Sequence, residues 1–166
     1  MSRKAISHLF ILIPMLLLFS CGASKEPLTE ANWRQMENTV THRSFMFSAN
    51  SVDTRSGRLN RMDNLGYMKM DGDQVEMELP YFGSSQVSTT YGRTEGMRFE
   101  GAATDIATKK NETGGYYDLN FNLKNKSEVL ECNLRVFSGM RAALTINSSK
   151  RSTIRYDGSI TQGNFD

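Results

Sequence analysis

An alternation of apolar and polar side chains with a period of two runs through most of the chain after Ser44 and constrains its fold more than any other feature. It is clearest in three segments, 117–123, 130–136 and 142–146. Because successive side chains of a strand point to opposite faces, such segments are typical of strands with one buried and one exposed face. We therefore expect Phe121, Leu134 and Ile146 to be buried, and Asn120 and Asn133 to face water.

Turn signals separate the alternating segments. Asp71-Gly72-Asp73 lies between segments 65–70 and 74–79 and is typical of a hairpin, because glycine supplies the positive φ angle of a tight turn. Weaker strand candidates are residues 86–91, 97–99 and 103–109, and the last strand is expected to end at Asp157-Gly158. The pattern predicts an all-β antiparallel meander of about eight strands, closed into a barrel or split as a barrel-like sandwich.

One short helix precedes the strands. Thr29 is a suitable N-cap residue for a helix over residues 29–41, and Leu28 before it is placed to pack on Trp33. Trp33, Met36 and Val40 make a narrow apolar stripe at helical spacing. We expect this helix to dock on the sheet or to plug its open end.

The N-terminus has the pattern of an export signal. Arg3 and Lys4 precede an apolar run over residues 9–19, which is too short to span a bilayer and fits a secretory signal peptide over residues 1–20. The run ends at Ser20-Cys21-Gly22, which resembles a bacterial lipobox, although Phe19 is bulkier than usual. That resemblance implies acylation of Cys21, with residues 21–28 as a tether and residues 29–166 as a single β domain.

Charge and tether composition bear on partners and location. Without Arg3 and Lys4 of the leader, 18 Lys and Arg balance 18 Asp and Glu, which argues against nucleic acid as a partner. The membrane is the expected partner through Cys21. Only Glu26 follows the cysteine closely, beside Lys25, whereas some bacteria mark surface lipoproteins with an acidic cluster there. We expect an outer-membrane lipoprotein on the periplasmic face of the cell envelope.

The residue types that carry most catalytic and metal chemistry are scarce. Beyond the leader the chain has a single histidine, His42, and no nucleophile, phosphate-loop or zinc motif accompanies it. Cys132 alternates with leucines on an apolar face and is expected to be a buried free thiol. We therefore expect no catalytic residues, no metal and no cofactor.

Two groups of residues are candidates for ligand contact. Pro80 should end strand pairing, and the adjacent Tyr81 and Phe82 should then either plug the barrel end or form a rim that grips an apolar ligand. Met68 and Met70 alternate with Tyr67 in the first hairpin strand, where methionines either fill the core or form an adaptable contact surface on the second face.

Three passages carry a resemblance to a known family. Segments 45–49, 79–83 and 151–158 are similar to domain-of-unknown-function family 4251, small lipoproteins of Bacteroidetes-type bacteria. The resemblance implies a lipocalin-like barrel and brings no activity or site residues. Together these features predict a non-enzymatic, lipid-anchored envelope protein that binds an apolar small ligand or lipid. The alternative is a structural or assembly factor that contacts another envelope protein through its outer surface and the Trp33 helix.

Overall fold

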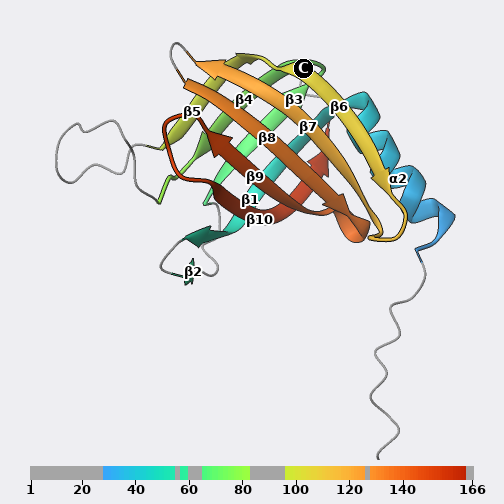
Figure 1. Cartoon of the computed structure of the whole chain (residues 1–166). Coiled ribbons are helices and arrows are strands. Elements are labelled where there is room, and N and C mark those ends of the chain that lie inside the picture. The colour runs from blue at the N-terminus through green and yellow to red at the C-terminus, as the bar shows by residue number, and fades with distance from the viewer. Residues whose placement is uncertain (1–27, 55–56, 60–64, 83–95, 126–127, 164–166) are drawn as a thin grey trace, which may run out of the picture.

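The computed structural model describes residues 28–54, 57–59, 65–82, 96–125 and 128–163. In this part of the chain a helix is followed by strands that form a nearly closed antiparallel barrel, as the alternation predicts (Figure 1). The elements are α2 (Glu30–His42), β1 (Ser44–Thr54), β2 (Gly57–Leu59), β3 (Gly66–Asp71), β4 (Gln74–Leu79), β5 (Met97–Ala102), β6 (Thr104–Asn111), β7 (Tyr116–Asn125), β8 (Glu128–Phe137), the 3-10 turn η2 (Ser138–Met140), β9 (Arg141–Ser148) and β10 (Ile154–Gln162).

The first long strand of the sheet pairs with the last, in the middle of the strand order. The described strand order is β5-β4-β3-β1-β10-β9-β8-β7-β6, with β2 paired to β1 alone, and every ladder in it is antiparallel. Phe45 lies opposite Gln162 and Phe47 opposite Ile160 in the β1–β10 ladder. This ladder joins the N-terminal strands of the sheet to the C-terminal ones. The apolar faces of both groups of strands therefore surround one core.

The two edges of the sheet, β5 and β6, are joined by a single residue, Ala103. Eight antiparallel pairings separate β5 from β6 in the strand order, so the two strands run in the same direction. Residues 97–111 are therefore one bent extended segment that pairs with β4 in its first half and with β7 in its second half. The buried Ala103 N–H donates to the carbonyl oxygen of Asp73 at 2.7 Å, which fixes the bend.

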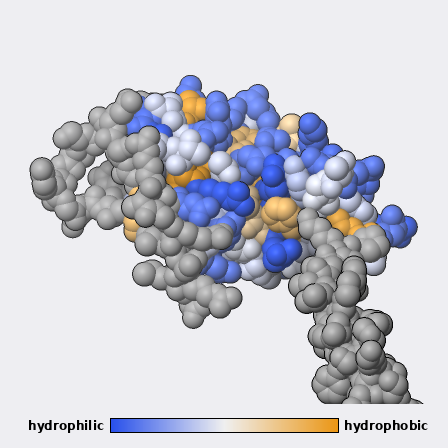
Figure 2. Space-filling model, turned by 60° about the horizontal axis from the view of Figure 1, so that its bottom comes forward, coloured by the Kyte–Doolittle hydropathy of each residue, from blue (hydrophilic) through white to orange (hydrophobic). Residues whose placement is uncertain are grey.

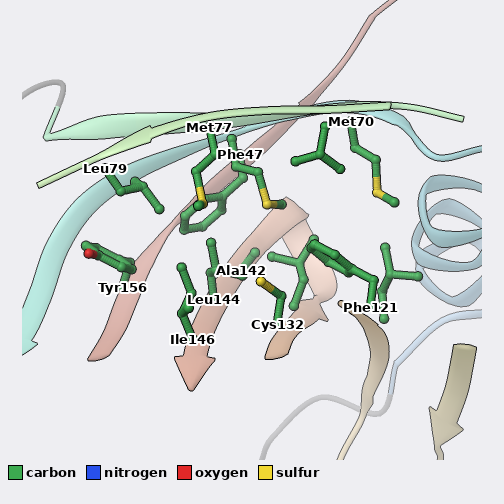
Figure 3. Close-up of a cluster of buried hydrophobic side chains, with 14 of the residues drawn as sticks. Phe47, Met70, Met77, Leu79, Phe121, Cys132, Ala142, Leu144, Ile146 and Tyr156 are labelled. Atoms are coloured by element: carbon green, nitrogen blue, oxygen red, sulfur yellow. The ribbon is translucent and has the colours of Figure 1, made fainter. Parts of the chain in front are cut away.

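The barrel interior is occupied by packed side chains. Phe121, Leu134 and Ile146 are buried, as predicted, and Cys132 lies among them. Figure 3 shows Phe47 and Met77 pointing toward Leu144 and Ile146 from the facing side of the barrel. These side chains exclude water from the barrel axis, so apolar burial is the main stabilising contribution to the fold.

Helix α2 covers one end of the barrel (Figure 1). The Thr29 side chain caps it by accepting a hydrogen bond from the Asn32 N–H, as predicted for this residue. Met36 and Val40 are buried and Trp33 packs edge-on against Tyr117 of β7, with ring centroids 5.7 Å apart. The helix therefore plugs the end where β1 begins and β10 ends.

The structure differs from the sequence prediction at the last strand. Its predicted end at Asp157-Gly158 is wrong, because β10 continues to Gln162. Gly158 lies inside the β1–β10 ladder opposite Ala49, next to a β-bulge in β1. A Cβ at Gly158 would lie 2.0 Å from the Ser48 carbonyl oxygen, so close backbone approach and not a turn explains this glycine.

Other strand predictions were close in position. Segment 97–99 extends to Ala102, and segment 103–109 corresponds to β6, whose weak pattern reflects an edge strand with mostly exposed side chains. The hairpin loop consists of Gly72 and Asp73, since Asp71 pairs with Gln74. The strand predicted over residues 86–91 and the leader over residues 1–20 lie outside the described residues.

Candidate functional site

The barrel end opposite α2 carries the Leu79–Phe82 passage. Tyr81 is buried in the core, and its hydroxyl lies 3.1 Å from Ser152 Oγ and 3.3 Å from the Ser152 carbonyl oxygen. Phe82 is half-buried against the same core, while Gly83 lies outside the described residues. Of the two adjacent aromatic residues, Tyr81 is therefore the one that points into the barrel.

Tyr156 of β10 also holds the Leu79–Phe82 passage in place. The Tyr156 hydroxyl donates a 2.6 Å hydrogen bond to the Pro80 carbonyl oxygen. Tyr156 is fully buried, and burial raises the pKa of its hydroxyl above the usual value for tyrosine, so that the hydroxyl stays protonated and remains a donor. The chain leaving β4 is therefore tied to the start of β10 at this end of the barrel.

An ion pair lies beside these tyrosines. Arg151 Nε is 3.0 Å from Glu128 Oε1, and both side chains are about 17% exposed. The Ser148 hydroxyl donates to the same carboxylate oxygen at 2.5 Å, and the Arg151 guanidinium lies 5.2 Å from the centre of the Tyr81 ring. The guanidinium is held by charge, hydrogen bonding and a cation–π contact together.

A cleft of about 1150 Å³ opens at this end of the barrel. Its apolar lining consists of Met46, Leu65, Leu79, Pro80, Met97 and Leu130. Its charged lining consists of Glu78, Arg98, Glu128 and Arg151, which form two acid–base pairs. The cleft thus combines apolar residues with a few placed polar groups, a combination that small-molecule sites also show.

One wall of the cleft follows directly from the strand register. Ser48, Tyr67, Glu78 and Arg98 lie opposite one another across β1, β3, β4 and β5, and so form a row on the outward face. Glu78 pairs with Arg98, and the Tyr67 hydroxyl donates to Glu76, which raises the pKa of Tyr67. Polar groups therefore line the outer side of the cleft while Leu79 and Met97 line its inner side.

The structure places the other predicted contact residues differently. Met68 and Met70 are fully buried in the core, on the inward face of β3, and neither lines the cleft. The interpretation of these methionines as a second, outward contact face is wrong, because Tyr67 and Lys69 have the outward positions of that strand. Cys21, the predicted lipidation residue, lies outside the described residues.

Sequence reasoning missed the cleft pairs. Glu78 and Arg98 are 20 residues apart, as are Ser148 and Glu128, and only the strand pairings bring them together. Arg151 is one of five basic residues between positions 135 and 155. Two other members of that group, Arg135 and Arg155, bind Asp118 at 2.8 Å and Asp157 at 3.1 Å, so their charges are largely balanced.

No group of three or more His, Cys, Asp or Glu side chains in the described part of the chain could hold a metal ion. Nor does that part of the chain contain a helix of sufficient length and apolar character to cross a membrane. Figure 2 shows a face on which hydrophilic residues predominate and hydrophobic residues form small separate areas.

The fold and its end cleft define a small all-β barrel protein closed at one end by a helix. A family model matches residues 28–160, and the chain belongs to that family, DUF4251, a domain of unknown function. The chain is also similar to the crystal structure of a DUF4251 family protein from Bacteroides eggerthii DSM 20697, with a TM-score of 0.61 and 18% identity over 80% of this chain and 88% of that one. Among curated proteins no match was found.

Proposed function

We propose that this protein is a non-enzymatic, lipid-anchored protein of the cell envelope that binds an apolar or amphiphilic small ligand in the cleft opposite α2. The observation that carries the proposal is the position of three half-buried apolar residues, Met46, Leu65 and Pro80, in a cleft that also holds two charged pairs. Because packed side chains occupy the barrel axis, the ligand binds at the end of the barrel and not in a central cavity.

The anchor part of the proposal rests on the lipobox-like sequence around Cys21. An acylated Cys21 would hold the protein at a membrane, since each buried methylene contributes about 0.8 kcal/mol. The first described residue, Leu28, packs near Gly115 at the helix end of the barrel. The described part of the chain therefore begins at the end opposite the cleft.

Contact with another envelope protein through the outer surface is the alternative. It has less support, because among the described residues Val129 is the one large hydrophobic side chain that is exposed. Surfaces that bind other proteins usually carry larger contiguous apolar patches.

Ligand binding is tested by titrating the purified full chain with a fluorescent fatty acid. Met46 is half-buried in the cleft, and Met46→Gln keeps its side-chain length but removes apolar character, so we expect a loss in affinity of about tenfold or more. Met140→Gln is the matched control, because Met140 is half-buried at the helix end, and its affinity should equal that of the unaltered protein. Absence of saturable binding would contradict the ligand proposal.

A further inference from the structure

The described part of the chain begins at the helix end of the barrel, a short distance in sequence after the predicted anchor. Leu28 packs on the β6–β7 turn, where a Cβ at Gly115 would lie 2.9 Å from Leu28 Cδ1. Leu28 follows Cys21 by seven residues, and seven residues span at most about 25 Å when fully extended. An acyl anchor on Cys21 would therefore keep the helix end within about 25 Å of the membrane.

Aromatic side chains lie at this same end. Trp33 is half-buried and packs edge-on against Tyr117, while Lys110 Nζ lies 4.6 Å from the centre of the Trp33 ring. One residue before Tyr117, Tyr116 lies on the outer face of β7, and its ring meets that of Phe137 with the centroids 5.8 Å apart. We use the term helix-end surface for four half-buried side chains at this end, Leu28, Trp33, Tyr116 and Phe137.

Two rings of the helix-end surface each have a basic side chain over them. Arg135 lies over Tyr116, with its guanidinium carbon 3.9 Å from the ring centre, as Lys110 lies over Trp33. Trp and Tyr are enriched at the head-group level of membranes, because their rings have an apolar body and a polar tip. Long basic side chains beside them can lay their stems on apolar groups while their charges remain among the head groups. The combination therefore fits the boundary between a bilayer and water.

The charges at the helix end are close to balanced. Four ion pairs lie there, with nitrogen–oxygen distances of 2.8 to 3.3 Å: Arg34–Glu30, Arg43–Asp73, Lys110–Glu112 and Arg135–Asp118. Lys109 and Arg141 add positive charge, while Glu37 and Asp71 add the same amount of negative charge. Long-range attraction to an anionic surface therefore contributes little here, and contact with a membrane would depend on the aromatic and apolar side chains.

A weak contact is sufficient for a domain that is already anchored. A short flexible link gives the linked groups an effective concentration in the millimolar range. Four half-buried side chains that would not hold the protein on a membrane from solution can therefore keep one end of an anchored barrel on the head groups.

From this arrangement we infer that the helix-end surface contacts the phospholipid head groups of the membrane that holds Cys21. The inference rests on the lipid anchor of the proposed function and adds an orientation to it. β7 runs for ten residues, about 30 Å, from Tyr116 at the helix end to Asn125 in the lining of the cleft. The cleft then opens away from the anchoring bilayer, so its ligand enters from the aqueous side and not from that bilayer.

Trp33 is the one tryptophan in the sequence and reports on this contact directly. The acylated full chain, purified from membranes, is reconstituted in phosphatidylcholine vesicles with and without phosphatidylcholine brominated high on its acyl chains, because bromine quenches tryptophan fluorescence at short range. The matched control carries Trp33→Phe and Val129→Trp, since Val129 is 37% exposed near the start of β8, at the cleft end. We expect the brominated lipid to quench position 33 several-fold more than position 129.

A substitution within the surface tests the contact itself. Phe137→Glu places a charge on the helix-end surface and should reduce the quenching of Trp33 about twofold or more, whereas Val129→Glu should leave it unchanged. Equal quenching at positions 33 and 129, in a protein that floats with the vesicles in a density gradient, would overturn the inference and leave the lipid anchor standing. A protein that does not float with the vesicles would overturn the anchor and the inference together.

Discussion

The hydroxyl of Tyr156, the third residue of β10, donates a hydrogen bond to the carbonyl oxygen of Pro80, which directly follows β4. The two residues are 76 positions apart in the chain. This bond and the contacts of Tyr81 with Ser152 hold the residues after β4 across the end of the barrel. The position of the cleft therefore depends on two buried tyrosines.

Removal of the Tyr156 hydroxyl tests this relationship. Tyr156→Phe keeps the ring but leaves the Pro80 carbonyl without its partner, which should cost about 1–3 kcal/mol of unfolding free energy. Tyr81→Ala should cost a few kcal/mol because Tyr81 is buried, and Phe82→Ala should cost less because Phe82 is half-buried. Urea denaturation measures all three, and equal losses at Tyr81 and Phe82 would show that the two aromatic residues share the plug.

Core substitutions test the strand registers. Phe121→Ala, Leu134→Ala and Ile146→Ala each remove a buried side chain and should lower the unfolding free energy by roughly 2–5 kcal/mol. Asn120→Ala should cost well under about 1 kcal/mol, because its exposed amide makes one 2.8 Å hydrogen bond, with Asn133. Similar losses for the two sets in denaturant melts would contradict the registers.

Gly158 should tolerate no side chain. Gly158→Ala places a Cβ against the Ser48 carbonyl oxygen, a backbone atom that cannot move aside without separating β10 from β1. We expect the unfolding free energy to fall by about 4 kcal/mol, which is at the upper end of single-substitution effects. Ser159→Ala, at the exposed neighbouring position, is the control and should leave the thermal midpoint nearly unchanged. A stable Gly158→Ala protein would show that the two strands are farther apart.

Stability should fall at alkaline pH through Cys132. Burial raises the pKa of this thiol to about 12, whereas the unfolded thiol ionises near about 8.5. Between these values the unfolded state binds fewer protons than the folded state, so the unfolding free energy decreases as pH rises, by up to about 1.4 kcal/mol per pH unit. Well below about pH 8.5 the thiol is protonated in both states, so the contribution of Cys132 to the unfolding free energy no longer changes with pH.

Urea melts between pH 7 and 10 measure this slope. Cys132→Ala should be less stable at pH 7 but should show a smaller decrease toward pH 10, since the hydroxyl of Tyr156, whose pKa burial also raises, ionises in the unfolded state only near about pH 10. The Cys132 thiol should also react with a thiol reagent at pH 8 only in denaturant, because the side chain is buried. Rapid labelling of the native protein would contradict its burial.

Cys21→Ser tests the membrane anchor. Loss of the thiol should abolish acylation and move the protein from the membrane to the soluble fraction, which fractionation and intact-mass measurement detect. Gly22→Ala, next to the cysteine, is a suitable control and should remain acylated. Unchanged mass and membrane retention of the Cys21→Ser protein would contradict the lipoprotein proposal.

The sequence by itself determined which residues face the core. Alternation along β4, β7 and β8 predicts their burial, because a strand can bury only every second side chain. The helix is also predicted from neighbouring residues alone. The signals are the N-cap residue Thr29 and an apolar stripe that consists of Trp33, Met36 and Val40. These properties depend on neighbours within a few residues, so one sequence is sufficient to read them.

Only the tertiary structure decided how the barrel closes and where its site lies. The β1–β10 ladder, the strand role of Gly158 and the burial of Met68 and Met70 on the inner face of β3 depend on partners distant in the chain. The Glu78–Arg98 and Glu128–Arg151 pairs likewise result from strand pairing and loop packing, and no short motif precedes either. Local periodicity specifies which face of the sheet each side chain occupies. The pairing of strands depends on packing between residues that are distant in the chain, and no local pattern of the sequence specifies that packing.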